Sequence, residues 1–460
     1  MEKSAIKSSL SLKIFIIGFL IFILMIPTGM IAILVNERQN RQEEAFREVS
    51  EKWGAAQTIT GPILSVPYNK KTESVANGVV SNFSVVQYAH FLPDKLLAEG
   101  KINPETRKRG IYEVAVYNTE LKLSGEFIAP DFKKWGINPA DVMLDKAFVS
   151  VGIPDMRGVK ENIDLLWDSS KLAFKPGIET KDVLSSGVSV VVPNLSDGKS
   201  HAFSLDLSLN GSQDLMFSPI GKETEVKISS AWTDPSFQGA FLPNSYEIND
   251  GGFTADWKIL ELNRNFPQSF LGSASFVSNL PINDGQYEKF QTMQSGDFGS
   301  SNFGVRLLIP ADEYQKTVRA LKYAILTLSL TFLVLFFFEA LRKKKVHPMQ
   351  YILIGLALSL FYVLLLSLAE YIGFDMAYLL SSLATVGLIK LYSKSIFNSW
   401  KPALIESSIL AFIYAFIYVI LQLEDFSLLV GSIGLFAILA SIMYVSRKID
   451  WYNLGSSENN

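Results

Sequence analysis

The sequence predicts a membrane α-helical protein with six transmembrane helices and a large extracytoplasmic β-rich domain, an antiparallel sandwich or a barrel-like fold. Three observations lead to this fold class. Apolar runs of bilayer length lie on both sides of a long polar region, the polar region alternates with a period of two residues, and the loops between apolar runs alternate in charge. Charged residues make up 19% of the chain, which is below the roughly 25% of soluble domains.

The first apolar run, residues 14–35, predicts a retained membrane anchor. It follows three lysines in residues 1–13 and leads into the polar segment NERQNRQEEAF. A cleaved signal peptide would have a shorter apolar core, of about 7–15 residues, and a small-residue cleavage site. We therefore expect residues 1–36 to form an N-terminal cytoplasmic tail and the first transmembrane helix.

Residues 37–57 are predicted to continue as a helical stalk. Acidic residues precede basic ones by four positions three times, the favourable order on a helix: Glu37–Arg41, Glu43–Arg47 and Glu48–Lys52. One face carries apolar residues at helical spacing: Phe46, Val49, Trp53 and Ala56. This face could dock on the domain that follows, although a solvated stalk is the simpler interpretation.

Residues 58–318 are predicted to form the extracytoplasmic β-rich domain, as one unit or as two smaller units of fold. Segments 112–127 and 201–217 alternate apolar and polar residues, and the second contains an Asn210–Gly211 turn signal. Clusters of Gly, Pro, Asn and Asp separate such runs at short intervals. This spacing is typical of an antiparallel sandwich or a barrel-like fold.

Residues 319–446 are predicted to form a five-helix membrane bundle. Between Lys322 and Glu339 lie sixteen residues without charge. With their apolar flanks they allow a helix, rising about 1.5 Å per residue, to cross a bilayer core of roughly 30 Å. Residues 310–321 indicate a capped helical lead-in. Four further apolar runs follow at 351–369, 376–392, 403–421 and 427–445.

The basic residues predict which side of the membrane each part occupies. The loops after the second and fourth spans and the segment after the last span are basic, whereas the loops between them carry acidic residues only. The topology-determining residues are Arg342, Lys343, Lys344, Lys345, Lys390, Lys394, Arg447 and Lys448. Because basic loops stay in the cytoplasm, we expect both termini, including the 447–460 tail, to be cytoplasmic and the β-rich domain to lie outside.

Several kinds of chemistry have no support in the composition. The chain has no cysteine and three histidines, His90, His201 and His347, none at the spacing of a helical metal site. It also has no nucleophile elbow, Walker A loop or dinucleotide motif. We therefore expect no catalytic, cofactor-binding or metal-binding residues. The net charge of −3 gives no basic field for nucleic acid.

Two groups of polar residues allow more than one interpretation. Asp155 and Arg157, in the loop VGIPDMRG, could bind a polar ligand or form a local ion pair that stabilises a turn. The charged residues of the predicted spans lie near span ends, where their side chains can reach the interface: Glu339, Glu370, Lys390 and Glu406. Hydroxyl groups inside the spans are expected to bond to local carbonyls or to neighbouring helices. The spans lack the paired broken segments of inverted-repeat transporters.

A series of motifs, in this order along nearly the whole chain, resembles the bacterial inner membrane protein CreD family. The resemblance is densest in PADEYQKTVRALKYAILTLSLTFLVLFFFEAL (310–341) and HPMQYILIGLALSLFYVLLLSLAEYIGF (347–374). Shorter matching segments are GPILSVP (61–67), RGIYEVAVY (109–117), VGIPDMRG (151–158), WTDPSFQGAFLP (232–243), GGFTADW (251–257) and IDWY (449–452). The resemblance implies a multi-pass inner membrane protein associated with two-component regulation, envelope integrity, colicin tolerance and responses to β-lactams. It implies no catalytic residues.

Three functional hypotheses follow. The first is a non-enzymatic inner membrane protein that serves envelope integrity or the stress response through its periplasmic domain, with the lipid bilayer and an envelope protein or polymer as partners. The second is a transporter or export accessory, which would show a membrane-embedded cavity lined by Ser, Thr and Tyr. The third is an envelope hydrolase, which would need an acid–base cluster near His90, His201 or Asp155.

Overall fold

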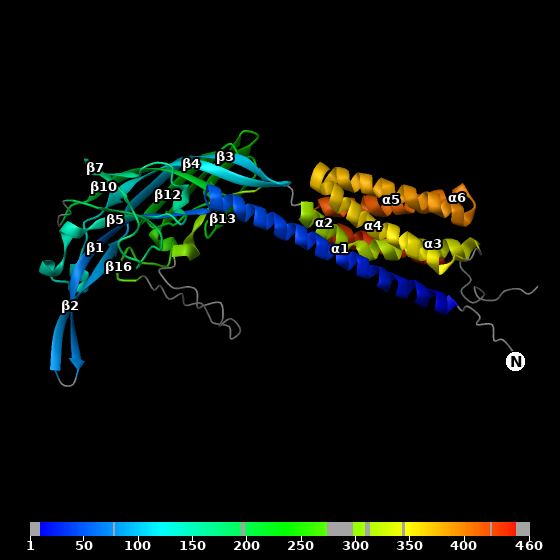
Figure 1. Ribbon diagram of the computed structural model, residues 1–460, viewed down its shortest axis with the longest axis horizontal. Coiled ribbons are helices and arrows are strands. Elements are labelled where there is room, and N and C mark those ends of the chain that lie inside the picture. Colours follow the sequence, from blue (N-terminus) through cyan, green and yellow to red (C-terminus); the bar gives the residue numbers. More distant parts are fainter. Residues whose placement is uncertain are drawn as a thin grey trace, which may run out of the picture. The chain divides into compact units, whose positions relative to one another are not determined.

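The apolar segments form helices and the alternating segments form strands in the computed structural model of the chain (Figure 1). The structure describes residues 10–76, 79–193, 195, 198–273, 298–308, 313–342, 346–423 and 426–447. Its contacts divide the chain into two compact units, Met1–Glu43 with Ala311–Asn460, and Glu44–Pro310. Each unit is described by itself.

The first unit is helical. Its helices are α1 (Leu10–Trp53), α2 (Glu313–Lys322), α3 (Ala324–Arg342), α4 (Pro348–Ile372), α5 (Phe374–Phe397), α6 (Trp400–Gln422) and α7 (Ser427–Ser446). The anchor and the stalk expected on either side of residue 36 are one continuous helix of 44 residues, α1, which passes through Pro27 without a break. Its last turns, from Glu44, belong to the second unit.

Four or five of the six expected membrane-spanning helices are supported by the described residues. Among the described residues, four helices are long and apolar enough to cross a bilayer: Phe15–Trp53, Pro348–Ile372, Phe374–Phe397 and Trp400–Gln422. A fifth is reached if Lys316–Lys322 and Ala324–Ala340, which are bent by 42° at the break, count as one span. The last apolar helix, Leu428–Tyr444, is shorter. The polar helix α2 meets the apolar helix α3 at Tyr323, and the sequence pattern that predicted a helical lead-in carries no information about the angle between them.

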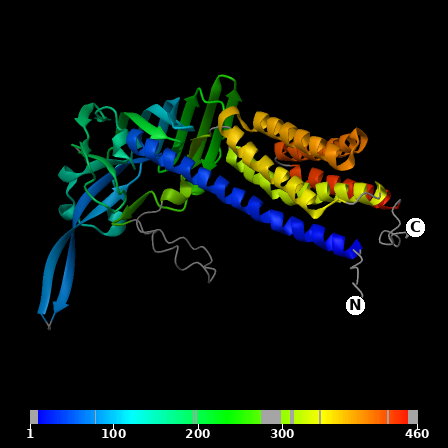
Figure 2. The same ribbon diagram turned by 45° about the vertical axis from the view of Figure 1, so that its right-hand side comes forward.

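The helices α3, α4, α5 and α6 lie side by side as a bundle (Figures 1 and 2). Their ends are set by local chemistry. His347 is the N-cap of α4, where its Nδ1 accepts from the Met349 N–H at 3.3 Å and the Gln350 side chain accepts from the His347 N–H at 3.0 Å. Pro348 occupies the first turn, where a missing N–H costs nothing. At the other end of the bundle, Arg319 of α2 donates to the Leu423 carbonyl at 3.1 Å.

The second unit contains two sheets. One sheet has the order β13-β17-β11-β1-β5-β9-β8, with β2 beside β1 and β16 beside β2. Its strands are β1 (Gln57–Ala76), β2 (Val79–Phe91), β5 (Phe148–Gly152), β8 (Lys175–Pro176), β9 (Gly187–Val191), β11 (Asp214–Phe217), β13 (Pro235–Gly239), β16 (Ser269–Leu271) and β17 (Phe303–Leu307).

The other sheet has the order β14-β15-β12-β3-β4-β10-β6-β7. Its strands are β3 (Lys95–Arg109), β4 (Tyr112–Phe127), β6 (Asp164–Trp167), β7 (Ser170–Ala173), β10 (His201–Ser212), β12 (Glu223–Ser230), β14 (Ser245–Asn249) and β15 (Gly252–Leu260). Buried residues of both sheets form one hydrophobic cluster, which includes Leu64 of β1, Leu121 of β4 and Leu207 of β10. The two sheets therefore share one core.

The expectation of a purely antiparallel domain is wrong. Strands β1 and β11 pair in parallel, with Gln57 opposite Leu215, and β3 and β12 pair in parallel, with Lys95 opposite Glu223. The sheets are therefore mixed. Alternation predicts that a segment is a strand, but it carries no information about which distant strand lies beside it or in which direction.

The alternation of β10 is confirmed, because its apolar residues are buried: Phe203, Leu205, Leu207 and Leu209. The turn predicted at Asn210–Gly211 is wrong. Both residues continue β10 and pair with Asn118 and Tyr117 of β4. A Cβ on Gly211 would lie 2.3 Å from the Tyr117 ring, so this position needs glycine for close packing and not for a turn.

The β1–β2 hairpin extends beyond the rest of the second unit (Figures 1 and 2). Its base belongs to the sheet, where β1 pairs with β5 at residues 60–65 and β2 pairs with β16 at residues 89–91. From the Asn69–Val86 pair to the Ala76–Val79 pair, the described parts of these strands pair only with each other. The outer half of the hairpin is therefore a two-stranded ribbon.

Candidate functional site

The topology-determining residues lie on helix ends. Lys390 and Lys394 are on the last turns of α5, with Lys394 Nζ 4.1 Å from the centroid of the Trp400 ring. Arg342 ends α3 and Arg447 follows α7. Lys343, Lys344, Lys345 and Lys448 lie outside the described residues. The side of the membrane on which these residues lie stays a prediction.

Asp155 forms a local ion pair and does not hold an open ligand site. Its carboxylate accepts from Arg157 Nε at 2.9 Å, from Arg157 Nη2 at 3.0 Å and from the Arg157 backbone N–H at 3.1 Å. It also accepts from the Ala55 N–H at 2.9 Å. The hydrogen bonds from Arg157 lower the pKa of Asp155. Because these donors occupy both oxygens, the turn interpretation is favoured over a polar ligand.

Side-chain contacts of Trp53 and Glu48 also hold the end of α1 against the sheets. Trp53 Nε1 donates to the Tyr117 carbonyl at 3.1 Å, and the Arg107 guanidinium lies 3.9 Å from the Trp53 ring centroid. Glu48 accepts from Arg109 Nε and Nη2 at 2.9 and 3.0 Å. Trp53 therefore docks on the second unit, whereas a solvated stalk was the simpler expectation for this segment.

Gly54, directly after α1, makes the close approach possible. Its φ is +147°, and a Cβ there would lie 2.6 Å from the Asn210 carbonyl oxygen. The start of β1 is held by Gln57, whose Nε2 donates to the carbonyls of Asp155 and Asn210 at 3.0 and 3.1 Å. A helix end, a loop and a central strand therefore meet at this junction.

His90 lies in an acid–base cluster that sequence reasoning could only suggest. Ser65 and His90 are opposite each other on β1 and β2, which brings the Ser65 Oγ within 2.8 Å of His90 Nδ1. The Asp182 carboxylate is 3.6 Å from His90 Nε2. These residue types can perform nucleophilic catalysis when a substrate reaches the serine. However, Ser65 is 3% exposed and His90 is fully buried, so the cluster gives no access to a substrate.

Burial also determines the charge of His90. Desolvation lowers the pKa of His90 to about 4, although the nearby Asp182 carboxylate acts in the opposite direction. The imidazole is therefore neutral at pH 7. A neutral, inaccessible histidine bonded to a serine stabilises the start of the hairpin, and the hydrolase hypothesis loses its support at this position.

His201 serves as a strand-end contact. Its Nδ1 is 2.8 Å from the Asp168 carboxylate, which also accepts from the Ala202 N–H at 2.9 Å. Its ring stacks on Trp167, with centroids 5.1 Å apart. Among the described residues, no three His, Asp or Glu side chains lie close enough together to hold a metal ion.

Two acidic residues of the bundle, Glu339 and Glu406, are more buried than the sequence indicated. Glu339 of α3 and Glu406 of α6 are buried inside the bundle, although the sequence placed both near the interface. Tyr351 of α4 donates to Glu339 at 3.2 Å. Both residues lie near helix ends, as expected, but the position of a residue along a span does not tell which face of the helix points to its neighbours, so the sequence did not predict their burial.

The hydroxyl groups of the spans divide into two classes. Thr327, Thr331 and Ser359 bond to the carbonyls of the preceding turn, as expected. Ser381 and Ser382 of α5 do not, because their Oγ atoms are buried without a hydrogen-bond partner in the described structure. The expectation is therefore confirmed for the first class and wrong for the second.

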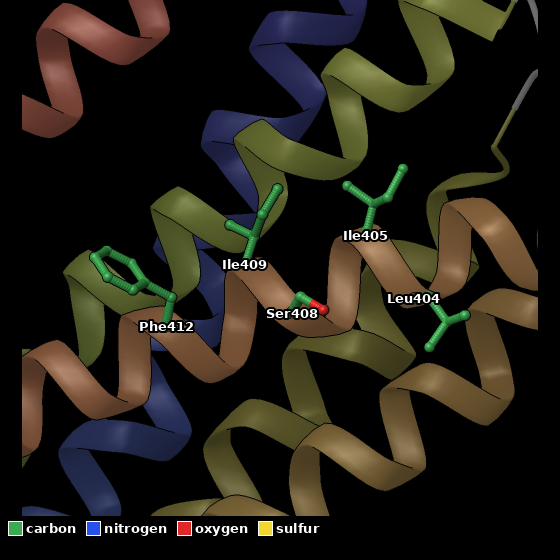
Figure 3. A pocket seen from close by; sticks show the side chains of 5 residues that line it. All are labelled: Leu404, Ile405, Ser408, Ile409 and Phe412. Carbon is green, nitrogen blue, oxygen red and sulfur yellow. The ribbon is translucent and has the colours of Figure 1, made fainter.

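A shallow depression of about 400 Å³ lies along α6 (Figure 3). It is lined by Leu404, Ile405, Ser408, Ile409 and Phe412. All five side chains extend from one helix, and four of them are apolar. In a bilayer such a surface faces acyl chains. Ser408 is the one hydroxyl residue of this lining, so the depression is not the Ser-, Thr- and Tyr-lined cavity between helices that the transporter hypothesis requires.

The outer β1–β2 ribbon carries exposed apolar side chains on β2. Phe83 is 47% exposed, and Val85 and Val86 are 41% and 50% exposed. Both edges of a two-stranded ribbon present unpaired backbone N–H and C=O groups, which can pair with a further strand. The ribbon therefore combines exposed apolar side chains with unpaired backbone groups to which a further strand can bond.

We expect the Asp155→Asn variant to lower the free energy of unfolding by about 1–3 kcal/mol, because the junction loses charge-assisted hydrogen bonds at a buried position. Denaturant unfolding of the purified full-length protein, followed by Trp fluorescence, measures this. The control is Glu126→Gln, which breaks the exposed Lys95–Glu126 pair and should have little effect. Equal losses in the two variants would show that the junction has no special role.

The lowered pKa of His90 predicts a loss of stability in acid. Between its ordinary pKa of 6.5 and about 4, the unfolded chain binds a proton at His90 and the folded chain does not. Stability should therefore fall with decreasing pH in this window, by up to about 1.4 kcal/mol per pH unit. The His90→Asn variant should show a smaller slope in the same unfolding assay at pH 7 and pH 5. Identical slopes would contradict a neutral, buried His90.

Comparison with known proteins identifies the family. The family model described as Inner membrane protein CreD matches residues 9–452. Inner membrane protein CreD of Escherichia coli (strain K12) is 30% identical over 451 residues, which is 97% of this chain and 95% of that protein.

Solved structures give only weak likenesses. An M1 zinc metallopeptidase from Deinococcus radiodurans is 8% identical over 36% of this chain and 38% of its own, with a TM-score of 0.19. A two-domain M1 zinc metallopeptidase bound to L-arginine is 9% identical over 40% and 42%, also with a TM-score of 0.19. The chain spans less than half of these proteins, and such scores carry no argument about fold or function. On the match of nearly its whole length, the chain belongs to the CreD family of inner membrane proteins.

Proposed function

We propose that this chain is a non-enzymatic, multi-pass inner membrane protein that contributes to envelope integrity or the envelope stress response. It would do so by binding a protein partner through its periplasmic β-rich domain. The observation that carries the proposal is the outer β1–β2 ribbon. Its strands pair only with each other in the described structure, and Phe83, Val85 and Val86 are exposed.

Physical reasoning favours a bound partner for this ribbon. A two-stranded hairpin alone is only marginally stable in water, and exposed apolar residues beside open strand edges promote association. A partner segment that added as a third strand would supply backbone hydrogen bonds and cover the apolar side chains. This fits a protein partner better than an envelope polymer, which has no strand edge to offer.

The proposal includes a topology. The chain would cross the membrane six times, with a cytoplasmic tail and first span in residues 1–36, a stalk in 37–57, a periplasmic domain in 58–318, a bundle in 319–446 and a cytoplasmic tail in 447–460. The alternation of basic and acid-only loops supports this arrangement. Long domains cross the membrane largely regardless of their own charge, so the basic residues of the domain do not oppose it.

A pair of single cysteines tests the topology, because the chain has none of its own. A Leu262→Cys variant should react with a membrane-impermeant thiol reagent in intact cells with a permeable outer membrane, since Leu262 is 94% exposed in the β-rich unit. A Lys344→Cys variant should react only after the inner membrane is opened. The reverse pattern of labelling would invert the topology.

A photo-crosslinking residue at position 83 tests the ribbon. In cells, the full-length protein with this residue should give a discrete covalent adduct, because Phe83 lies on the surface that the partner covers. The same residue at position 262, which is more exposed but far from the ribbon along the chain, is the matched control and should give none.

A variant with a shortened β1–β2 hairpin tests whether the ribbon is needed for the proposed function. Residues 70–85 would be replaced by an Asn-Gly turn, which favours a two-residue hairpin connection. If the variant reaches the membrane at the normal level, its cells should become sensitive to detergent. Full detergent resistance at that level would contradict the proposal.

A further inference from the structure

Glu406 of α6 is an acidic residue without a partner in the interior of the bundle. It is 1% exposed, and neither of its carboxylate oxygens has a hydrogen-bond partner in the described structure. Ser393 of α5 neighbours it, and the Ser393 Oγ is also buried without a hydrogen-bond partner. Two polar groups from adjacent helices therefore face each other with nothing described between them.

A second carboxyl group belongs to the same end of the bundle. Glu339 of α3 accepts a hydrogen bond from Tyr351 of α4, and the Tyr351 hydroxyl is within electrostatic range of both Glu339 and Glu406. The two carboxyl groups differ in their partners, because Glu339 accepts the Tyr351 hydroxyl and neither oxygen of Glu406 accepts a hydrogen bond in the described structure.

Among the described side chains of the surrounding helices, none forms a salt bridge with Glu406. On α5, Lys390 and Lys394 form no described salt bridge with it, and Lys394 lies over Trp400. On α7, Tyr444 is exposed. The α1 segment from Phe15 to Val35 has no charged residue. The described groups that interact with Glu406 are therefore Ser393 and Tyr351, and Tyr351 in turn bonds to Glu339.

We propose that Glu406 binds a proton and that Glu406, Ser393 and the Glu339–Tyr351 pair form a proton-accepting site inside the bundle. An ionised carboxylate without a partner is costly in a low-dielectric interior, and acidic groups at such positions in membrane proteins commonly take part in proton transfer. The proton comes from water and returns to water, and no other bond changes. The neutral acid can donate to Ser393, which removes two unpaired buried groups at once.

This site goes beyond the proposed binding of a partner and does not depend on it. With the proton bound, Glu406 adds no charge to the interior formed by α3, α4, α5 and α6. Loss of the proton would leave a buried negative charge on Glu406 without a described partner and would favour a rearranged or hydrated bundle. The packing of the bundle would thereby follow the proton concentration at the end where Glu406 lies.

Infrared spectroscopy of the purified full-length protein in lipid at pH 7 tests the site. A protonated carboxylic acid has a C=O stretching band that ionised carboxylates lack, and this band shifts in heavy water. We expect wild-type protein to show the band and Glu406→Gln to lose it. Gln has nearly the shape of the neutral acid, so the variant should fold, and its thermal unfolding should match that of the wild type.

Two further variants complete the design. Glu370→Gln is the matched control, since Glu370 lies on α4 3.6 Å from Arg38, and it should keep the band. Glu339→Gln should also keep it. Loss of the band in Glu339→Gln but not in Glu406→Gln would place the proton on the other acid and overturn the proposal.

The wild-type protein provides a measurement that needs no variant. On titration to alkaline pH, the band should disappear reversibly as Glu406 releases its proton. If the wild type shows no such band at pH 7, and sodium, potassium or calcium ions raise its unfolding temperature but not that of Glu406→Gln, the site binds a metal cation and the proposal is wrong. Absence of the band without any cation effect would equally overturn it.

Discussion

The Asp155 carboxylate is the constraint on which the β-rich unit depends where it meets α1. It joins the loop after β5 to Ala55, one residue beyond the glycine that ends the helix, and it is itself held by Arg157. Trp53 on one side and Gln57 on the other then have fixed positions against β4 and β10. Because a carboxylate accepts several charge-assisted hydrogen bonds, one buried acid can hold a helix end, a loop and a strand in a single arrangement.

The β-rich unit combines a closed interior with one open element. Its two sheets share a core, and the buried His90 and Ser65 side chains are bonded to each other and inaccessible. The outer β1–β2 ribbon is different, because it leaves the sheet and keeps apolar side chains in solvent. Folded proteins usually cover or charge such edges. An uncovered ribbon on an otherwise closed unit is better explained by association than by stability, and this is why the proposed function rests on it and not on the histidines.

The helical unit contains a similar contrast. Its outer face along α6 is apolar and open, as expected of a surface in contact with lipid. Its interior holds Glu339, Glu406 and several hydroxyl groups that bond to one another or to backbone, together with a few that have no described partner. Such groups are expensive in a bilayer. Their presence in the bundle that anchors the protein indicates a role beyond anchoring.

The sequence by itself predicted the helical and the β-rich regions, because periodicity and apolar length depend only on neighbouring residues. It also determined the family resemblance, whereas it left a docked and a solvated face of α1 as alternatives. It did not determine the parallel pairing of β1 with β11, the register that brings Ser65 to His90, or the burial of Glu406. Each of these depends on which distant element lies alongside, and local patterns carry no such information. Only the tertiary structure decided them, since a residue's charge, access and partners follow from its neighbours in space.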